Sequence, residues 1–209
     1  MRSFSKQEIK ELNKIYRLNL INSLSGYKSA NLIGTKGKKG ENLAIFSSVV
    51  HLGANPALLG FIMRPATVPR NTLTNMKRSK HFTINSINES FVENAHHTSA
   101  NFKEGISEFE ACNLTPEYLD NFSAPFLKES NLKVAMKLEQ IIDIKLNDTK
   151  LIVGSIENVY LDETALCENG QVDLNALKTV AISGLNRYHK VEEIAKFPYS
   201  RVSELPEFK

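Results

Sequence analysis

The chain has 209 residues, the length of one large domain or of two small ones. Apolar residues make up 42% of it, so the chain can bury a sizeable core. Its net charge of +3 comes from basic and acidic residues spread along the whole sequence, which argues against a dedicated nucleic-acid surface.

Membrane and disulfide classes are also disfavoured. The charged N-terminus lacks the apolar segment of a signal peptide, and no apolar run approaches the roughly 18 residues that cross a bilayer. Cys112 and Cys167 belong to no CxxC pattern, which suits a reducing compartment. We therefore expect a soluble, cytoplasmic protein.

The first predicted element is a helix near the N-terminus. Ser5 is a capping residue, and Ile9, Leu12, Ile15 and Tyr16 follow it at helical spacing. Beyond it, short apolar runs divided by Gly, Asn and Pro predict strands, at residues 31–35, 42–50, 57–63 and 82–87. The glycines of Lys36–Gly40 predict a hairpin turn.

A short helix is predicted between the third and fourth strands, because Pro69 opens a segment in which Leu73 and Met76 share one face. Residues 88–121 are more polar and are predicted to be helical in parts, with a helix start at Thr115–Pro116–Glu117.

Two long strands are predicted at residues 134–146 and 151–161, and Asn147–Asp148 between them favours a hairpin. Strands outnumber helices, and long helices do not alternate with the strands as in a parallel sheet. The pattern therefore indicates a mainly β protein, an antiparallel barrel with peripheral helices.

The order of these segments resembles a known family. "LIGT", a charged glycine turn, "NLAIFSSVVHLGANPALLGFIMRP", "TVPRNTLTNMKRSKHFTIN" and "TSANFKEGISEFEACNLTP" follow one another as in the flavin reductase-like family of FMN-binding split-barrel proteins. The resemblance runs from about Leu32 to about Arg201. It implies a single domain over residues 1–209 with an N-terminal helical extension at 1–25. It also implies a six-stranded antiparallel split barrel of Greek-key type that forms a homodimer.

The resemblance implies FMN as the cofactor, bound near the dimer interface. Such a protein passes hydride between NADH or NADPH and FMN, as an NAD(P)H:flavin oxidoreductase. A non-catalytic FMN protein that passes electrons to a partner protein is the alternative, and a cofactor-free structural dimer is a third. Because the flavin carries the redox chemistry, we assign no catalytic residue.

The serine pair lies at the family's flavin-contacting position. There the resemblance places Phe46, Ser47, Ser48 and Val49 against the flavin. It implies that backbone amides of residues 46–50 bond the polar edge of the ring and that Ser47 and Ser48 help to hold the phosphate. Neighbouring strand residues point to opposite faces, so at most one serine hydroxyl faces a ligand. The alternatives are that the serines bond within the sheet and that Phe46 fills the barrel. Asn42 is either a contact or a turn residue.

Arg64 is predicted to hold the phosphate. It follows an apolar strand, where an unpaired charge is costly, and its planar guanidinium suits a phosphate. A surface salt bridge is the alternative. Asn71 and Thr72 lie at the start of the next helix, whose amides and dipole favour a phosphate, although ordinary capping explains them too.

The resemblance adds residues around the flavin mouth. It places Asn85, Ser99 and Asn101 against the flavin, and brings Tyr188 and His189 toward nicotinamide or substrate. A turn role for Asn85 and a surface role for Tyr188 and His189 are the alternatives. His96 and His97 lack the spacing of metal ligands, so no metal site is predicted.

Overall fold

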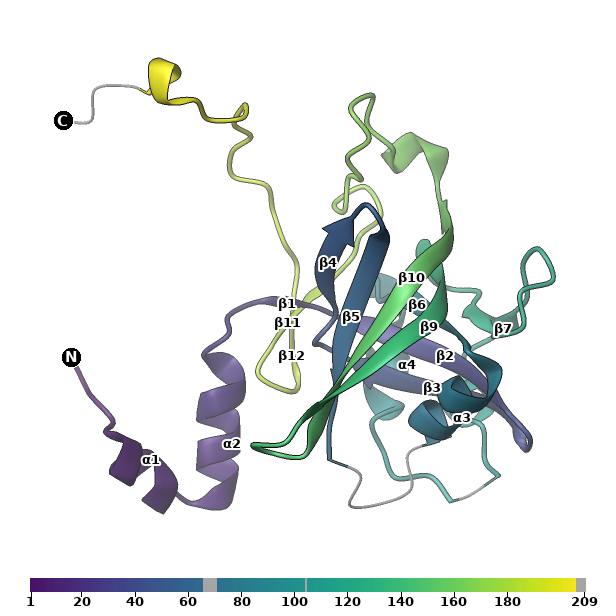
Figure 1. The fold of residues 1–209 in the computed structure, drawn as a ribbon, viewed down its shortest axis with the longest axis horizontal. Helices are drawn as coiled ribbons and strands as arrows, with labels where there is room; N and C mark the ends of the chain where they lie inside the picture. The colour runs from purple at the N-terminus through teal and green to yellow at the C-terminus, as the bar shows by residue number, and fades with distance from the viewer. Residues whose placement is uncertain (66–70, 104, 206–209) are drawn as a thin grey trace.

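The structure is a computed structural model that describes residues 1–65, 71–103 and 105–205. Its centre is an antiparallel sheet of seven strands, in the order β3–β2–β6–β9–β10–β5–β4 (Figure 1). The strands are β2 (Asn31–Gly37), β3 (Gly40–Phe46), β4 (Val50–Ala54), β5 (Ala57–Met63), β6 (His81–Ser86), β9 (Leu132–Ile144) and β10 (Thr149–Leu161). The mainly β, antiparallel prediction is confirmed. The sheet has seven strands rather than six, because the predicted strand 42–50 ends at Phe46 and a separate strand, β4, follows from Val50.

Smaller elements surround this sheet. The remaining strands are β1 (Lys28–Ser29), β7 (Pro116–Glu117), β8 (Phe126–Leu127), β11 (Ala181–Ser183) and β12 (Arg187–His189). The helices are α1 (Lys6–Glu11), α2 (Lys14–Ser23), α3 (Asn71–Ser79), α4 (Val92–His97) and α5 (Glu108–Ala111), with single 3-10 turns η1 (Glu89–Phe91), η2 (Glu163–Ala165) and η3 (Val202–Glu204).

Two predictions about helix starts have different outcomes. The one at Thr115–Pro116–Glu117 is wrong, because Pro116–Glu117 pairs with β8 as a short strand. Proline lacks an N–H, but a strand edge tolerates it as well as a first helical turn does. The helix predicted after Pro69 is present as α3, although Pro69 itself lies outside the described residues.

The hairpin of β9 and β10 is confirmed and lies at the middle of the sheet order. Its strands pair from Leu132–Leu161 at the open end to Ile144–Thr149 at the turn, where Asp148 has a φ of 57°. β6 pairs with the outer edge of β9, and β5 pairs with the outer edge of β10. The hairpin therefore joins the two halves of the sheet.

Apolar side chains fill both sides of β2. Ile33 packs with β5, β6, β9, β10 and α3 in the barrel interior, whereas Leu32 packs with α4, α5 and the segment 180–182 on the outside. Gly34 lets another segment approach, because a Cβ there would lie 2.2 Å from the Pro125 carbonyl oxygen. Because successive side chains of β2 point to opposite faces of the sheet, this strand contributes to both hydrophobic cores.

The predicted N-terminal helix begins where expected but is interrupted. Ser5 Oγ accepts a hydrogen bond from the Glu8 N–H, and the Glu8 carboxylate accepts one from the Ser5 N–H, which forms a capping box. Asn13 then accepts a bond from the Ile15 N–H and starts α2 as a separate helix. No helix of the described residues is long and apolar enough to cross a membrane.

Candidate functional site

A turn containing the serine pair separates β3 from β4. β3 ends at Phe46 and β4 begins at Val50, so the prediction of one continuous strand over 42–50 is wrong here. The Ser48 hydroxyl accepts a hydrogen bond from the Ile62 N–H at 3.0 Å and donates one to the Ile62 carbonyl at 3.3 Å. Ser48 thereby extends the β4–β5 pairing through its side chain, as the sheet-bonding alternative predicts.

The backbone of this turn offers hydrogen-bond donors. Ser47, Ser48 and Val49 are half-buried. Within the described residues, the N–H groups of these three contribute none of the backbone hydrogen bonds found outside helices and strands. Buried N–H groups normally have an acceptor, and successive N–H groups form concavities for electron-rich groups. The turn is therefore a candidate site for a polar ring edge.

Phe46 and Asn42 point into the barrel from β3. The Phe46 ring lies 4.8 Å from the Phe61 ring, centroid to centroid, and packs against the interior cluster. Asn42 is buried and donates a hydrogen bond of 3.3 Å to the Thr72 hydroxyl on α3. Phe46 therefore serves packing, whereas Asn42 ties β3 to α3.

A cavity of about 370 Å³ lies beside α3, between the β2–β3 turn and the segment 105–107. The polar side chains around it come from Lys38, Lys39, Glu41, Asn42, Asn71, Thr74, Asn75, Arg78 and Ser107. The hydroxyl of Ser107 is buried and has no hydrogen-bond partner among the described residues. Among the described lining residues, the three cationic groups of Lys38, Lys39 and Arg78 outnumber the one carboxylate, that of Glu41, so together with the unsatisfied hydroxyl they suit an anionic ligand.

Arg64 follows the last residue of β5, and its side chain is exposed. It is not among the described residues that line the cavity beside α3. Asn71, exposed at the first position of α3, does line it, whereas Thr72 is buried against Asn42. The structure thus brings Asn71 and Asn42 to one cavity. Arg64, which comes directly after β5 in the sequence, is not part of that cavity.

Asn85 takes a structural position. It is fully buried, and its amide donates to the Leu32 carbonyl and to the Thr83 hydroxyl. Its amide oxygen accepts a bond from the Leu127 N–H at 2.9 Å. Because these bonds use both ends of the amide inside the fold, the described geometry leaves no surface of Asn85 for a flavin, so we drop it from the candidate contacts.

The remaining predicted residues fall into two places. Ser99 and Asn101 are exposed just beyond α4. Tyr188 reaches α4 from β12, and its hydroxyl is 3.0 Å from His96 Nδ1. Both rings line a cavity of about 490 Å³, and burial raises the pKa of Tyr188 to about 12. His189 instead bonds the Ser183 hydroxyl within its own small sheet.

Sequence reasoning missed Glu108, which ties α5 to β3. Its carboxylate accepts a hydrogen bond of 3.0 Å from the Leu43 N–H, and burial raises the pKa of this carboxyl. The bond holds the start of α5, next to Ser107, against the strand that leads into the serine turn. Nothing in the local sequence of this four-residue helix signals such a contact with a distant strand.

Residues 27–173 match the family model described as flavin reductase like domain. The chain belongs to this family. A crystal structure of a candidate flavin reductase with a split barrel domain from Shewanella frigidimarina is 49% identical, with a TM-score of 0.92 over 96% of this chain and 100% of that one. The predicted family and split-barrel architecture are thereby confirmed.

More distant solved structures share the fold. Nitrilotriacetate monooxygenase component B from Bacillus cereus is 24% identical and has a TM-score of 0.82 over 94% of this chain and 98% of that one. An FMN-binding protein from Thermus thermophilus is 17% identical, with a TM-score of 0.73 over 95% of this chain and 100% of that one.

Proposed function

We propose that this flavin reductase-like protein binds FMN and transfers hydride between NADH or NADPH and the flavin. The observation that carries the proposal is the half-buried serine turn, in a chain that belongs to the flavin reductase-like family. Within the described residues, its successive N–H groups make none of the backbone hydrogen bonds found outside helices and strands. The flavin supplies the redox chemistry, and the protein binds and orients it.

The ring and the phosphate are proposed to lie on different elements. The N–H groups of Ser47, Ser48 and Val49 would hold the polar edge of the ring, and the exposed Ser99 and Asn101 would border it. Arg64 and the start of α3, at Asn71 and Thr72, would hold the phosphate. FMN rather than a dinucleotide flavin is supported by the FMN-binding protein that shares the fold.

Tyr188 is proposed to face the nicotinamide or another substrate. Its hydroxyl is held by His96 at the wall of a cavity, and its raised pKa keeps it protonated and able to donate a hydrogen bond. His189, which bonds Ser183, would support the β11–β12 hairpin that carries Tyr188.

A homodimer is proposed through the outer face of β4, β5 and β10. Strand register places Gly60 opposite both Val50 and Val153, so these three share the face opposite to the interior Phe61. Val50 is 48% exposed and Leu52 41%. An apolar sheet face of this kind marks an interaction surface, and a self-complementary patch suits a twofold dimer.

Anaerobic reduction tests the activity. The protein is loaded with FMN, and NADH or NADPH is added without oxygen while the visible absorption of the flavin is followed. We expect bleaching by at least one nucleotide. Bound flavin that neither nucleotide bleaches would favour the non-catalytic electron-transfer alternative. Failure to bind FMN at all would reject the proposal.

Arg64→Ala tests the phosphate contact. A charge-assisted hydrogen bond contributes about 1.5–3 kcal/mol, so we expect the Kd for FMN to rise roughly ten- to a hundredfold. Flavin fluorescence titration measures it, with Arg187→Ala, another exposed arginine, as the control. Equal affinities of Arg64→Ala and the unmodified chain would remove Arg64 from the site.

A further inference from the structure

The cavity beside α3 and the cavity beside Tyr188 carry opposite charge. Among the described residues, three cationic side chains and one carboxylate line the first. The described lining of the second includes the carboxylates of Glu89 and Glu93 and contains neither lysine nor arginine. Phosphate groups therefore suit the first cavity, whereas a neutral ring such as reduced nicotinamide suits the second.

The carboxylate of the cationic cavity, that of Glu41, has partners of its own. It accepts a hydrogen bond of 2.8 Å from the Tyr118 hydroxyl. The Lys36 ammonium lies 4.6 Å from the centroid of the Tyr118 ring and does not line the cavity. Tyr118 and, more weakly, the charge of Glu41 raise the pKa of Lys36. Because Lys36 offsets the carboxylate from outside, the cavity keeps an excess of positive charge.

Two other groups of this cavity can donate hydrogen bonds to an anion. Arg78 donates a hydrogen bond of 2.8 Å to the Lys36 carbonyl, which fixes its guanidinium against β2 and uses one of its five N–H donors. The Ser107 hydroxyl is buried, does not cap α5 and has no hydrogen-bond partner among the described residues. Since a buried hydroxyl normally has a partner, Ser107 indicates a ligand in the cavity.

The cationic end of the cavity lies apart from the proposed contact for the FMN phosphate. Asn71 is the first residue of α3 and lines the cavity. Arg78 follows it on the same helix by seven residues, which is about 10 Å along the helix axis. One phosphate group cannot contact both ends. With the FMN phosphate at the start of α3, the donors at Arg78 are left for a second phosphate.

This second phosphate would also lie away from the flavin ring. Asn42 lines the cavity near the start of β3, whereas the serine turn follows Phe46 at its end. The two residues are about 13 Å apart along an extended strand. NADPH differs from NADH by a 2′-phosphate on its adenosine, at the end remote from the nicotinamide that must reach the flavin. Arginine is a residue that accommodates this phosphate in dinucleotide sites.

We propose that the cavity beside α3 binds the 2′-phosphate of NADPH, so that the protein uses NADPH in preference to NADH. Lys38 and Arg78 would pair with the phosphate dianion, and the Ser107 hydroxyl would donate a hydrogen bond to it. The inference rests on the proposed hydride transfer and adds which of the two nucleotides is the substrate.

Nucleotide preference gives the first test. FMN-loaded protein is reduced anaerobically over a range of NADPH or NADH concentrations, and the bleaching rates give an apparent Kd for each nucleotide. We expect NADPH to bind at least about tenfold more tightly, which is the effect of a single charge-assisted hydrogen bond. Equal apparent Kd values for the two nucleotides in the unmodified chain would overturn the proposal.

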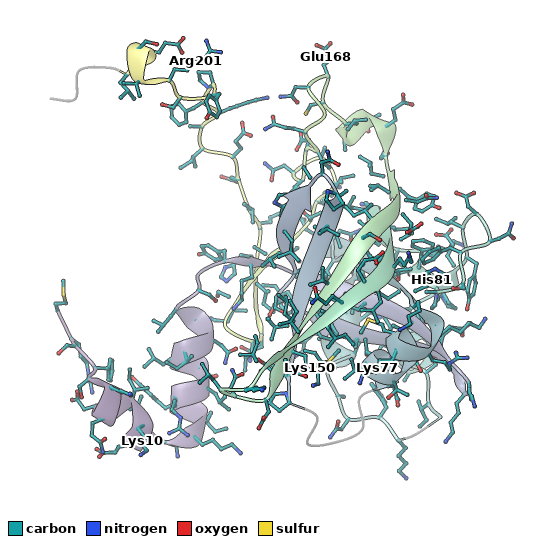
Figure 2. All side chains as sticks on the ribbon, in the orientation of Figure 1. Lys10, Lys77, His81, Lys150, Glu168 and Arg201 are labelled. Carbon is teal, nitrogen blue, oxygen red and sulfur yellow. The ribbon has the colours of Figure 1, made fainter. Side chains whose placement is uncertain are left out.

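A double variant, Lys38→Ala with Arg78→Gln, tests the cavity itself. Both side chains are exposed, so the fold should persist. We expect the apparent Kd for NADPH to rise to that for NADH, with the affinities for NADH and FMN unchanged. Lys77→Ala is the matched control, because Figure 2 shows Lys77 on α3 and it does not line the cavity.

Two results of the double variant would contradict the proposal. Equal weakening of NADPH and NADH would assign the cavity to the pyrophosphate that both nucleotides carry. A rise in the Kd for FMN, with the nucleotide preference retained, would assign the cavity to the FMN phosphate.

Titration calorimetry with NADP⁺ and NAD⁺ tests the site without hydride transfer. We expect FMN-loaded protein to bind NADP⁺ more tightly than NAD⁺, and Ser107→Ala to weaken NADP⁺ alone. Equal binding of the two oxidised nucleotides would overturn the proposal. If neither NADPH nor NADH bleaches the bound flavin, the reductase function is rejected, and this titration still decides whether the cavity binds the 2′-phosphate.

Discussion

The two faces of β5 and β10 have similar composition and opposite surroundings. On the inner face, Phe61 and Ile152 are fully buried in the barrel. On the outer face, Leu151 lies opposite Ile62, and Val153 lies opposite Gly60, yet none of this face belongs to a core cluster. An antiparallel sheet with one face in water alternates apolar and polar residues, and these strands do not. The outer face of β5 and β10 therefore has the apolar composition that the proposed dimer interface requires.

Phe61→Ala should have the largest effect, because it empties the middle of the inner face. The Phe61 ring lies between Phe46 and Phe82, at centroid distances of 4.8 and 5.8 Å. Truncation of a buried phenylalanine costs about 3–5 kcal/mol. Urea unfolding should show that loss. Ile62→Ala, the outward neighbour, is the control, and an equal loss for both would show that the two faces do not differ.

Val153→Asp should act on the outer face and weaken association. A carboxylate in the middle of an apolar interface must lose its water, so we expect dimer dissociation to become at least about tenfold easier, or about 1.4 kcal/mol. Sedimentation over a concentration series measures it. Leu166→Asp, at an exposed leucine off the sheet, is the matched control. An unchanged dimer would show that another surface mediates association.

Glu108→Gln should have the smallest effect on stability. It tests whether the Glu108 carboxyl, which bonds the Leu43 N–H of the edge strand β3, makes the stability depend on pH. Burial raises the Glu108 pKa above its ordinary value, so the folded state holds this proton more tightly than the unfolded chain does. The stability that this provides is present at low pH and is lost as the pH rises through the folded-state pKa. Glutamine keeps an acceptor for the Leu43 N–H but does not titrate.

The measurement is urea unfolding from about pH 4 to pH 8. Glu108→Gln should flatten the decline of stability with pH, and Glu110→Gln, exposed on the same helix, should leave it in place. If the free energy of unfolding of Glu108→Gln falls with pH as much as that of the unmodified chain, other titratable groups cause the fall.

Long regular elements could be predicted from the sequence. Runs of β-forming residues on both sides of Asn147–Asp148 predict β9 and β10. Ser5 and Glu8, three residues apart, predict the capping box that starts α1. These signals are local, because the residues that interact are close along the chain. The same holds for β5, which the structure places at residues 57–63 as predicted.

Features that depend on contacts between distant parts of the chain could not be predicted from the sequence. β1 is only two residues long and exists because it meets β11, more than a hundred residues further along the chain. β12 then pairs with β11 in a short local hairpin. The burial of Asn85 depends on Leu127, and that of Glu108 on Leu43. Around the candidate site, the turn at the serine pair was missed, because the sequence predicts one continuous strand over residues 42–50. The role of Ser48 as a partner of Ile62 could not be predicted either, because a side chain that replaces a backbone bond leaves no periodic signal.

The central hairpin constrains how the protein is made. β2, β3 and β6 can pair as they leave the ribosome, and so can β4 with β5, but no described strand joins these two groups until residues 132–161 have been synthesised. At about 5–20 residues per second, the bare edges of β5 and β6 wait for several seconds. During translation, those two edges are therefore where a chaperone would protect the nascent chain from aggregation.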